Sequence, residues 1–146
     1  MMMKKRVLFI CVHNAARSQM AEAFLQDLGA DLFEARSAGL EPTSVNPLVV
    51  EAMKELGHDL SDNTTKSVFK LYKEGMLFDY VITVCKESIE NKCPIFPGFT
   101  RRLSWGFDDP AALEGSWEER LEGTRKIRDE IRLKIEAWIS EIGKNE

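Results

Sequence analysis

The sequence predicts an α/β domain of three layers, in which helices cover both faces of a central parallel sheet. Short apolar runs rich in β-branched and aromatic residues alternate along the chain with longer stretches of helical period. Two of the apolar runs end in a cysteine, at the strand ends where parallel sheets collect functional side chains. We expect residues 1–146 to form one domain, because a chain of this length with 44% apolar residues can build one core.

The first three expected elements are a strand, a helix and a second strand. The apolar run over 6–12 is bounded by a loop and predicts a buried strand. Residues 18–28 have apolar side chains at helical spacing, and Gly29 closes this helix. Residues 32–40 alternate as a strand does and stop at Gly39.

The remaining elements are two helices, a strand and a long final helix. A helix is expected over 47–57, with a proline in its first turn and a glycine at its end, and a short helix over 65–72. Residues 78–85 predict another buried strand. The final helix spans 117–142, and its apolar face carries Leu121, Ile127, Ile131, Ile135, Trp138 and Ile142.

The charge balance argues against some classes of partner. Twenty basic and twenty-four acidic residues give a net charge of −4 with no basic block, which argues against nucleic acid. The apolar run near the start is too short for a signal peptide, and no run approaches the roughly 18 residues of a membrane span. We therefore expect a cytoplasmic protein with no membrane partner.

The three cysteines are predicted to be chemically active thiols. An odd number of cysteines without a secretion signal does not suggest a framework of structural disulfides. The spacing of Cys85 and Cys93 matches no common zinc pair, and the two histidines, His13 and His58, add no ligand cluster. We expect no metal.

The segment from Cys11 to Arg17 has the form C-x5-R and lies between a predicted strand and a predicted helix. Its intervening residues can turn their N–H groups around an oxyanion, and the helix dipole and the arginine fork add to the same point. These groups would also favour the thiolate of Cys11. The alternative is a buried cysteine followed by an ordinary loop. The expected anion-binding residues are Val12, His13, Asn14, Ala15, Ala16, Arg17 and Ser18.

The full string "CVHNAARSQMAEAF" resembles the family with the low-molecular-weight protein tyrosine phosphatase fold, and within it the thioredoxin-coupled arsenate reductases. Two later blocks, "VITVC…CP" at 81–94 and "WGFDDPA" at 105–111, resemble the same family in the same order. Phosphatases of this fold usually have a proline where this chain has Gln19. The resemblance implies an enzyme that binds arsenate or phosphate and has thioredoxin as its partner.

The resemblance also implies roles for the acid and for the two late cysteines. Asp109, directly before Pro110, would be the general acid, with Asp108 as the second choice. Cys11 would attack arsenic, Cys85 would attack Cys11 and release arsenite, and Cys93 would then attack Cys85 to give a disulfide for thioredoxin.

The segment between the late cysteines, residues 86–92, has no glycine or proline and is compatible with a helix. A helix would separate the Cα atoms of Cys85 and Cys93 by about 12 Å, whereas a disulfide needs roughly 5.5 Å. We therefore expect the segment to unwind or kink when the disulfide forms. The spacing is also one residue longer than is usual in the reductases.

Many of these reductases bind potassium near the segment from Cys11 to Arg17, which we call the anion loop. Asn14, Glu22 and Ser37 match the ligand positions, but Lys66 stands where an aspartate is usual. The hypothesis is that the Lys66 ammonium takes the place of the cation, so that the enzyme needs no cofactor.

Two alternatives remain open at this point. One is a low-molecular-weight protein tyrosine phosphatase that hydrolyses phosphoesters through a phosphocysteine; the Cys85 and Cys93 pair argues against it. The other is a non-catalytic carrier or redox sensor, against which the Asp109-Pro110 acid argues. The sequence leaves the physiological substrate, the reductant and the oligomeric state undetermined.

Overall fold

Four parallel strands form the single sheet of the computed structural model, which describes residues 3–87 and 89–144. Their order in the sheet is β2-β1-β3-β4. The strands are β1 (Lys5–Cys11), β2 (Phe33–Gly39), β3 (Tyr80–Cys85) and β4 (Arg101–Phe107). Because all pairs are parallel, the carboxyl ends of the strands meet at one edge. The predicted α/β class with a central parallel sheet is confirmed.

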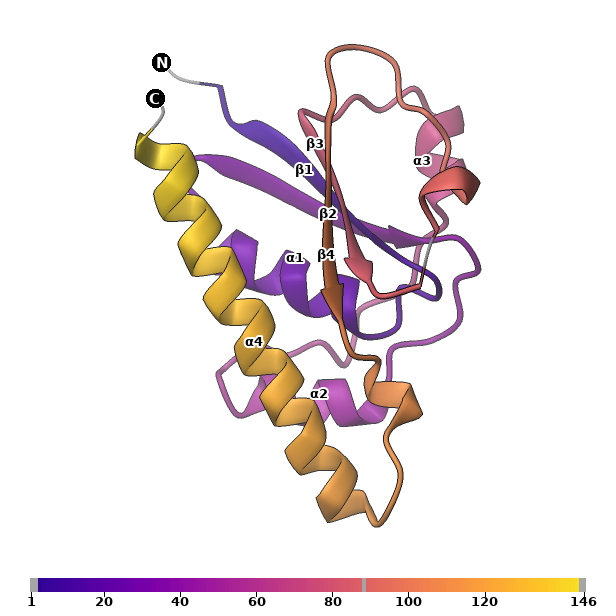
Figure 1. Ribbon diagram of the computed structural model, residues 1–146, viewed down its shortest axis with the longest axis vertical. Helices are drawn as coiled ribbons and strands as arrows, with labels where there is room; N and C mark the ends of the chain where they lie inside the picture. The colour runs from indigo at the N-terminus through magenta and orange to yellow at the C-terminus, as the bar shows by residue number, and fades with distance from the viewer. Residues whose placement is uncertain (1–2, 88, 145–146) are drawn as a thin grey trace.

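Helices cover the sheet on both sides (Figure 1). Helices α1 (Arg17–Leu28) and α4 (Trp117–Lys144) pack against each other and against the strands, and α2 (Pro47–Lys54) packs on α4. Helix α3 (Val68–Lys73) and the 3-10 turn η1 (Glu90–Lys92) lie across the sheet from α1. A second 3-10 turn, η2 (Pro110–Ala112), follows β4.

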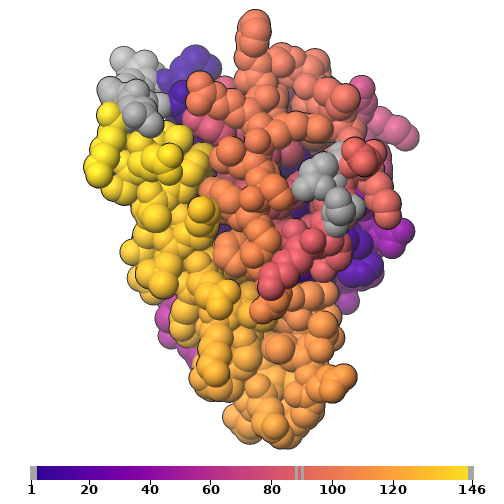
Figure 2. All heavy atoms as spheres, viewed as in Figure 1, coloured from indigo at the N-terminus to yellow at the C-terminus, as the bar shows by residue number. Residues whose placement is uncertain are grey.

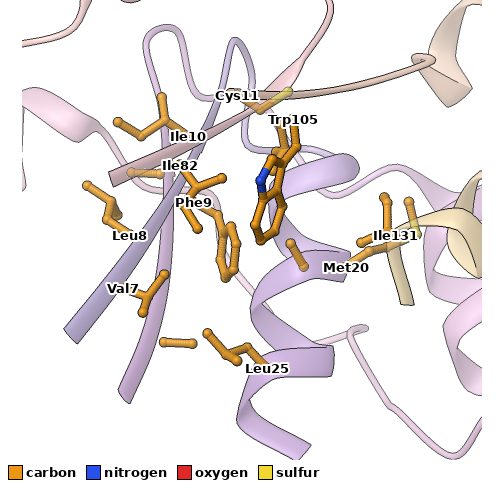
Figure 3. Close-up of a cluster of buried hydrophobic side chains, with 14 of the residues drawn as sticks. Val7, Leu8, Phe9, Ile10, Cys11, Met20, Leu25, Ile82, Trp105 and Ile131 are labelled. Atoms are coloured by element: carbon orange, nitrogen blue, oxygen red, sulfur yellow. The ribbon is translucent and has the colours of Figure 1, made fainter. Parts of the chain in front are cut away.

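The core is centred on β1, which has strands on both sides. All of Val7 to Ile10 are fully buried, as expected for a parallel strand with both faces covered. Figure 3 shows Phe9 on the side of the strand that faces α1, Leu8 and Ile10 on the other side, and Cys11 at the end of the same cluster. The indole of Trp105 lies 6.1 Å from the Phe9 ring and 5.6 Å from Trp138, ring centroid to ring centroid. The reactive thiol therefore ends a rigid, closely packed strand.

Two predicted helices are shorter than expected. Helix α2 ends at Lys54 instead of 57, because the chain turns there and reaches the left-handed conformation at Gly57, where φ is +86°. Helix α3 starts at Val68 instead of 65, because Lys66 N–H donates to the Asn14 side chain and Ser67 forms a parallel bridge with Gly39. These residues are held extended by the anion loop.

Strand β4 was not predicted. Its burial alternates only at its end, where Trp105 and Phe107 are buried while Arg101 and Arg102 are exposed. An edge strand with charged residues at its start has no apolar run to reveal it. The final helix carries the predicted stripe: five of its six members are buried and Ile142 is half-buried. Within residues 3–87 and 89–144, no helix is long and apolar enough to cross a membrane.

Candidate active site

The loop that joins β1 to α1 is built so that its N–H groups point inward. The carbonyl oxygens of Cys11, Val12, His13 and Ala15 accept hydrogen bonds from the backbone N–H groups of residues 40, 41, 43 and 46. Because a peptide N–H points away from its neighbouring carbonyl, these bonds turn the amides of the loop toward its centre. Helix α1 begins directly after the loop, so its N-terminal N–H groups add to the same centre. Such an arrangement can bind an anion.

Asn14 locks the loop. Its backbone has φ +53°, the only positive φ outside glycine in the described chain, and its side chain is fully buried. The Asn14 amide donates to Ser18 Oγ at 2.8 Å and accepts from Gln19 Nε2 at 3.1 Å and from Lys66 N–H at 2.9 Å. A buried side chain with its polar atoms satisfied fixes the strained backbone around it.

The Cys11 thiol is buried and lies against Cys85 at the carboxyl end of the neighbouring strand. A hydrogen bond from the Cys85 thiol lowers the pKa of Cys11 to about 7 against the effect of burial, with help from the charge of Arg17 and the Val12 N–H. The same hydrogen bond raises the pKa of Cys85, and burial adds to the effect. Cys11 therefore ionises before Cys85, and Cys85 is the protonated partner in the resting site.

Arg17 is 3% exposed and stands at the mouth of the loop. It donates to the Phe107 carbonyl oxygen at 3.0 Å, and its two terminal nitrogens reach the Glu87 carboxylate at 3.3 Å and 3.1 Å. Its Nε is buried and has no hydrogen-bond partner among the described residues. A buried donor without a partner beside a ring of amides suits a bound oxyanion.

The two candidate acids have different surroundings. Asp109 caps η2 by accepting from Ala111 N–H at 2.9 Å, and its other oxygen lies 3.5 Å from Arg17 Nη2. Asp108 pairs at 2.6 Å with Lys86, and its side chain is 63% exposed. Asp109 therefore faces the anion site and Asp108 faces solvent.

The structure places Cys93 against residues of β3 and β4, whereas Cys11 and Cys85 end β1 and β3. Cys93 is half-buried, packs against the core, and lines a cavity of about 120 Å³ with Val81, Thr83, Arg102, Leu103 and Ser104. It thus lies beside the strand that ends in Cys85. None of the three cysteines forms a disulfide.

The helix considered for residues 86–92 is wrong for the described part of that segment. Only η1, residues 90–92, is helical, and it is a 3-10 turn; residue 88 lies outside the described residues. Near its start, the Glu87 side chain is held by Arg17, and the Glu87 carbonyl oxygen lies 3.8 Å from Cys85 Sγ. These contacts hold the start of the segment away from helical geometry.

His13 contributes its backbone to the loop. Its ring is exposed, and Nδ1 lies 2.9 Å from the Glu41 carbonyl oxygen, outside the ring of amides.

The residues expected around a monovalent cation lie close together, and the Lys66 ammonium belongs to the same group. Ser37 hydroxyl donates to the Glu22 carboxylate, and Lys66 Nζ lies 4.0 Å from the same carboxylate and 3.2 Å from the Thr64 carbonyl oxygen. The Asn14 amide oxygen already accepts two hydrogen bonds. No group of three or more metal-binding side chains occurs among the described residues.

Sequence reasoning missed two residues of the site. Gly39 was read only as a strand end, yet a Cβ there would lie 2.7 Å from both Asn14 N and the Val12 carbonyl oxygen. Glu87 was not singled out, and no motif marks it. A glycine directly opposite the predicted anion loop was a signal for the first; for the second there was none.

The comparisons with known proteins agree with this geometry. A family model described as low molecular weight phosphotyrosine protein phosphatase matches residues 6–146. An arsenate reductase from Shouchella clausii (strain KSM-K16) is 42% identical over 138 residues, which is 94% of this chain and 96% of the relative. The solved structure of an arsenate reductase in its reduced state has a TM-score of 0.76 at 30% identity, covering 94% of this chain and 98% of that one.

A thioredoxin-dependent arsenate reductase from Corynebacterium glutamicum has a TM-score of 0.69 at 30% identity, covering 99% of this chain and 64% of that one. The sequence matches span nearly the whole chain, and the solved structures have the same fold as this chain. The chain therefore belongs to the low molecular weight phosphotyrosine protein phosphatase family.

Proposed function

We propose that this chain reduces arsenate to arsenite through a relay of Cys11, Cys85 and Cys93 that thioredoxin regenerates. The observation that carries the proposal is the hydrogen bond between the Cys85 and Cys11 thiols at the anion loop. Hydrolysis of a phosphoester needs one thiol and an acid, whereas the supply of two electrons to arsenate needs a second thiol within reach of the first. Relatives that are about 40% identical over nearly the whole chain are arsenate reductases, which supports the same reaction.

In the first step the loop amides and Arg17 bind the arsenate oxygens. The Cys11 thiolate attacks arsenic and forms a sulfur–arsenic bond, while one arsenate oxygen leaves as water. Asp109 donates the proton to that oxygen, because its carboxyl group faces Arg17 at the mouth of the loop.

In the second step Cys85 attacks the Cys11 sulfur. A disulfide forms, the electron pair of the sulfur–arsenic bond stays on arsenic, and arsenic(V) becomes arsenic(III) and leaves as arsenite. The Cys11 thiolate raises the pKa of Cys85 in the resting site, through their hydrogen bond and through its charge. Once arsenic is bonded to Cys11 that thiolate charge is gone, so Cys85 ionises more easily only after the first step.

In the third step Cys93 attacks Cys85, releases the Cys11 thiolate and forms a second disulfide. Thioredoxin supplies two electrons and two protons to restore the Cys85 and Cys93 thiols. Cys93 lies beside β3 and β4 and is not bonded to Cys85 in this state, so the step brings the two sulfurs to bonding distance. The proposal places this reaction in the cytoplasm, where thiols are kept reduced.

The test is NADPH oxidation coupled through thioredoxin reductase and thioredoxin, with and without arsenate. We expect wild type to show arsenate-dependent oxidation and Cys93→Ser to stop after a single turnover. Hydrolysis of p-nitrophenyl phosphate is the matched control, because it uses Cys11 but not Cys93 and should be unchanged in the variant.

The second candidate is a phosphatase, which the anion loop, Arg17 and Asp109 would serve equally well. No arsenate-dependent oxidation in wild type, together with steady p-nitrophenyl phosphate hydrolysis, would favour it over the reductase. Stoichiometric modification of Cys11 without turnover in either assay would point instead to a carrier.

A further inference from the structure

The Glu87 carboxylate occupies the part of Arg17 that a substrate oxyanion needs. Arg17 Nη1 lies 3.3 Å from Glu87 Oε1, and Nη2 lies 3.1 Å from Oε2, so each carboxylate oxygen meets one nitrogen. A tetrahedral oxyanion offers two oxygens to the same fork in the same way. An oxyanion that takes these two nitrogens therefore competes with Glu87, which while bound leaves it only Nε and the second hydrogen of Nη2.

The ion pair joins two groups of very different exposure. The Arg17 side chain is 3% exposed and is also held by the Phe107 carbonyl oxygen. The Glu87 side chain is 46% exposed and belongs to the segment after β3, which lies at the surface beside β4 (Figure 2). Glu87 is thus the partner that is free to leave, since water can replace its contact with the arginine.

Glu87 is also connected to the second thiol of the relay. Its carbonyl oxygen lies 3.8 Å from Cys85 Sγ, two residues earlier in the chain, and shares the single Cys85 proton with the Cys11 thiolate. The side chain of Glu87 therefore contacts Arg17 in the anion site, and its backbone carbonyl contacts Cys85. In addition, the negative charge of Glu87 opposes ionisation of Cys11 and so raises the pKa of that thiol.

We propose that Glu87 is a built-in competitor of the substrate oxyanion, which holds Arg17 in the resting enzyme and is displaced when the oxyanion binds. Displacement frees the residue whose carbonyl holds Cys85, so Cys85 is released for attack only when the anion site is filled. Glu87 is a positioning residue in this scheme, since it acts through Arg17 and Cys85. The competition requires only a tetrahedral oxyanion, while the release of Cys85 rests on the proposed arsenate reduction.

The competition predicts a gain of affinity when Glu87 is neutralised. Suppose that the anion binds only those molecules in which Arg17 is free. Its apparent dissociation constant then equals the intrinsic constant divided by the fraction of such molecules. The half-exposed ion pair with Glu87 favours the paired state of Arg17 over the free state only modestly. We therefore expect phosphate to bind about three- to tenfold more tightly to Glu87→Gln than to wild type. Disruption of the site by the substitution would weaken binding, so a gain separates competition from a structural role.

The experiment uses inorganic phosphate as the probe. The rate of Cys11 alkylation by iodoacetamide is followed at increasing phosphate, and the concentration that halves the rate gives the dissociation constant. Glu41→Gln is the matched control: it removes the same charge near the loop, and the Glu41 carboxylate has no hydrogen bond or ion pair within the described residues. Thermal unfolding of each variant checks that it is folded.

Tighter phosphate binding in Glu87→Gln with unchanged binding in Glu41→Gln supports the competition. Equal tightening in both variants would show a general effect of charge and overturn it, as would unchanged or weaker binding in Glu87→Gln or the absence of phosphate protection in wild type. Because alkylation needs no turnover, a failure of NADPH oxidation with normal phosphate protection would count against the proposed function alone.

Discussion

Gly39 is the position where a single methyl group should disable the anion loop. Gly39 ends β2 opposite the loop, and the N–H of Leu40 donates to the Cys11 carbonyl oxygen. An ideal Cβ on Gly39 would lie 2.7 Å from Asn14 N and 2.7 Å from the Val12 carbonyl oxygen. Both atoms belong to backbone, so neither can move aside as the end of a side chain would.

The size of the effect follows from this overlap. The distance of 2.7 Å is about 0.7 Å short of the 3.4 Å at which ordinary contact begins, so the loop of Gly39→Ala must shift by several tenths of an ångström. Overpacking of a closed site costs about 1–3 kcal/mol of stability. Misplacement of reacting groups by about 1 Å costs on the order of 10²-fold in rate. We expect kcat/KM to fall between ten- and a hundredfold, roughly 1.4–2.7 kcal/mol.

The assay is p-nitrophenyl phosphate hydrolysis together with the phosphate protection of Cys11 and thermal unfolding. Gly143→Ala is the control, because nothing lies within 4 Å of a Cβ at Gly143 in α4, and alanine there should leave activity unchanged and stability equal or slightly higher. A cooperative unfolding transition in Gly39→Ala separates loop damage from loss of the fold. Activity and phosphate affinity within threefold of wild type would refute the close-approach argument.

Three further outcomes test the site. Asp109→Asn should lower p-nitrophenyl phosphate turnover by about 10²-fold, and Asp108→Asn by less than threefold because that carboxylate pairs with an exposed lysine; the reverse order would move the acid to Asp108. The alkylation rate of Cys11 should rise with pH around a midpoint near 7, since the thiolate is the reactive form. Cys85→Ala removes the hydrogen bond that stabilises this thiolate and should raise the midpoint by about one pH unit; an unchanged midpoint would contradict that cause. Arsenate reduction should be equal in sodium and in potassium salts, because the Lys66 ammonium stands beside the half-buried Glu22 carboxylate of the expected cation site. A large stimulation by potassium would contradict the hypothesis that the ammonium replaces the cation.

Local patterns in the sequence were sufficient for most of the framework. Strands β1 and β3 are continuous apolar runs, and α4 shows its stripe over its whole length, so periodicity identified them. The C-x5-R loop was identified because it lies between a strand and a helix start, which are both local features. The sequence pattern did not predict strand β4, because its pairing with β3, and not its own composition, makes it a strand.

The sequence by itself therefore determined the parallel α/β framework, the anion loop, and the set of thiols and acid that accompany it. Only the tertiary structure decided which of them meet: Cys11 with Cys85, Asp109 with Arg17, and Glu87 with the same arginine. The reason is physical. Hydrophobic period and turn chemistry act between residues a few positions apart, whereas these contacts join residues 70 or more positions apart. Such contacts depend on how the parallel strands bring their carboxyl ends to one edge of the sheet.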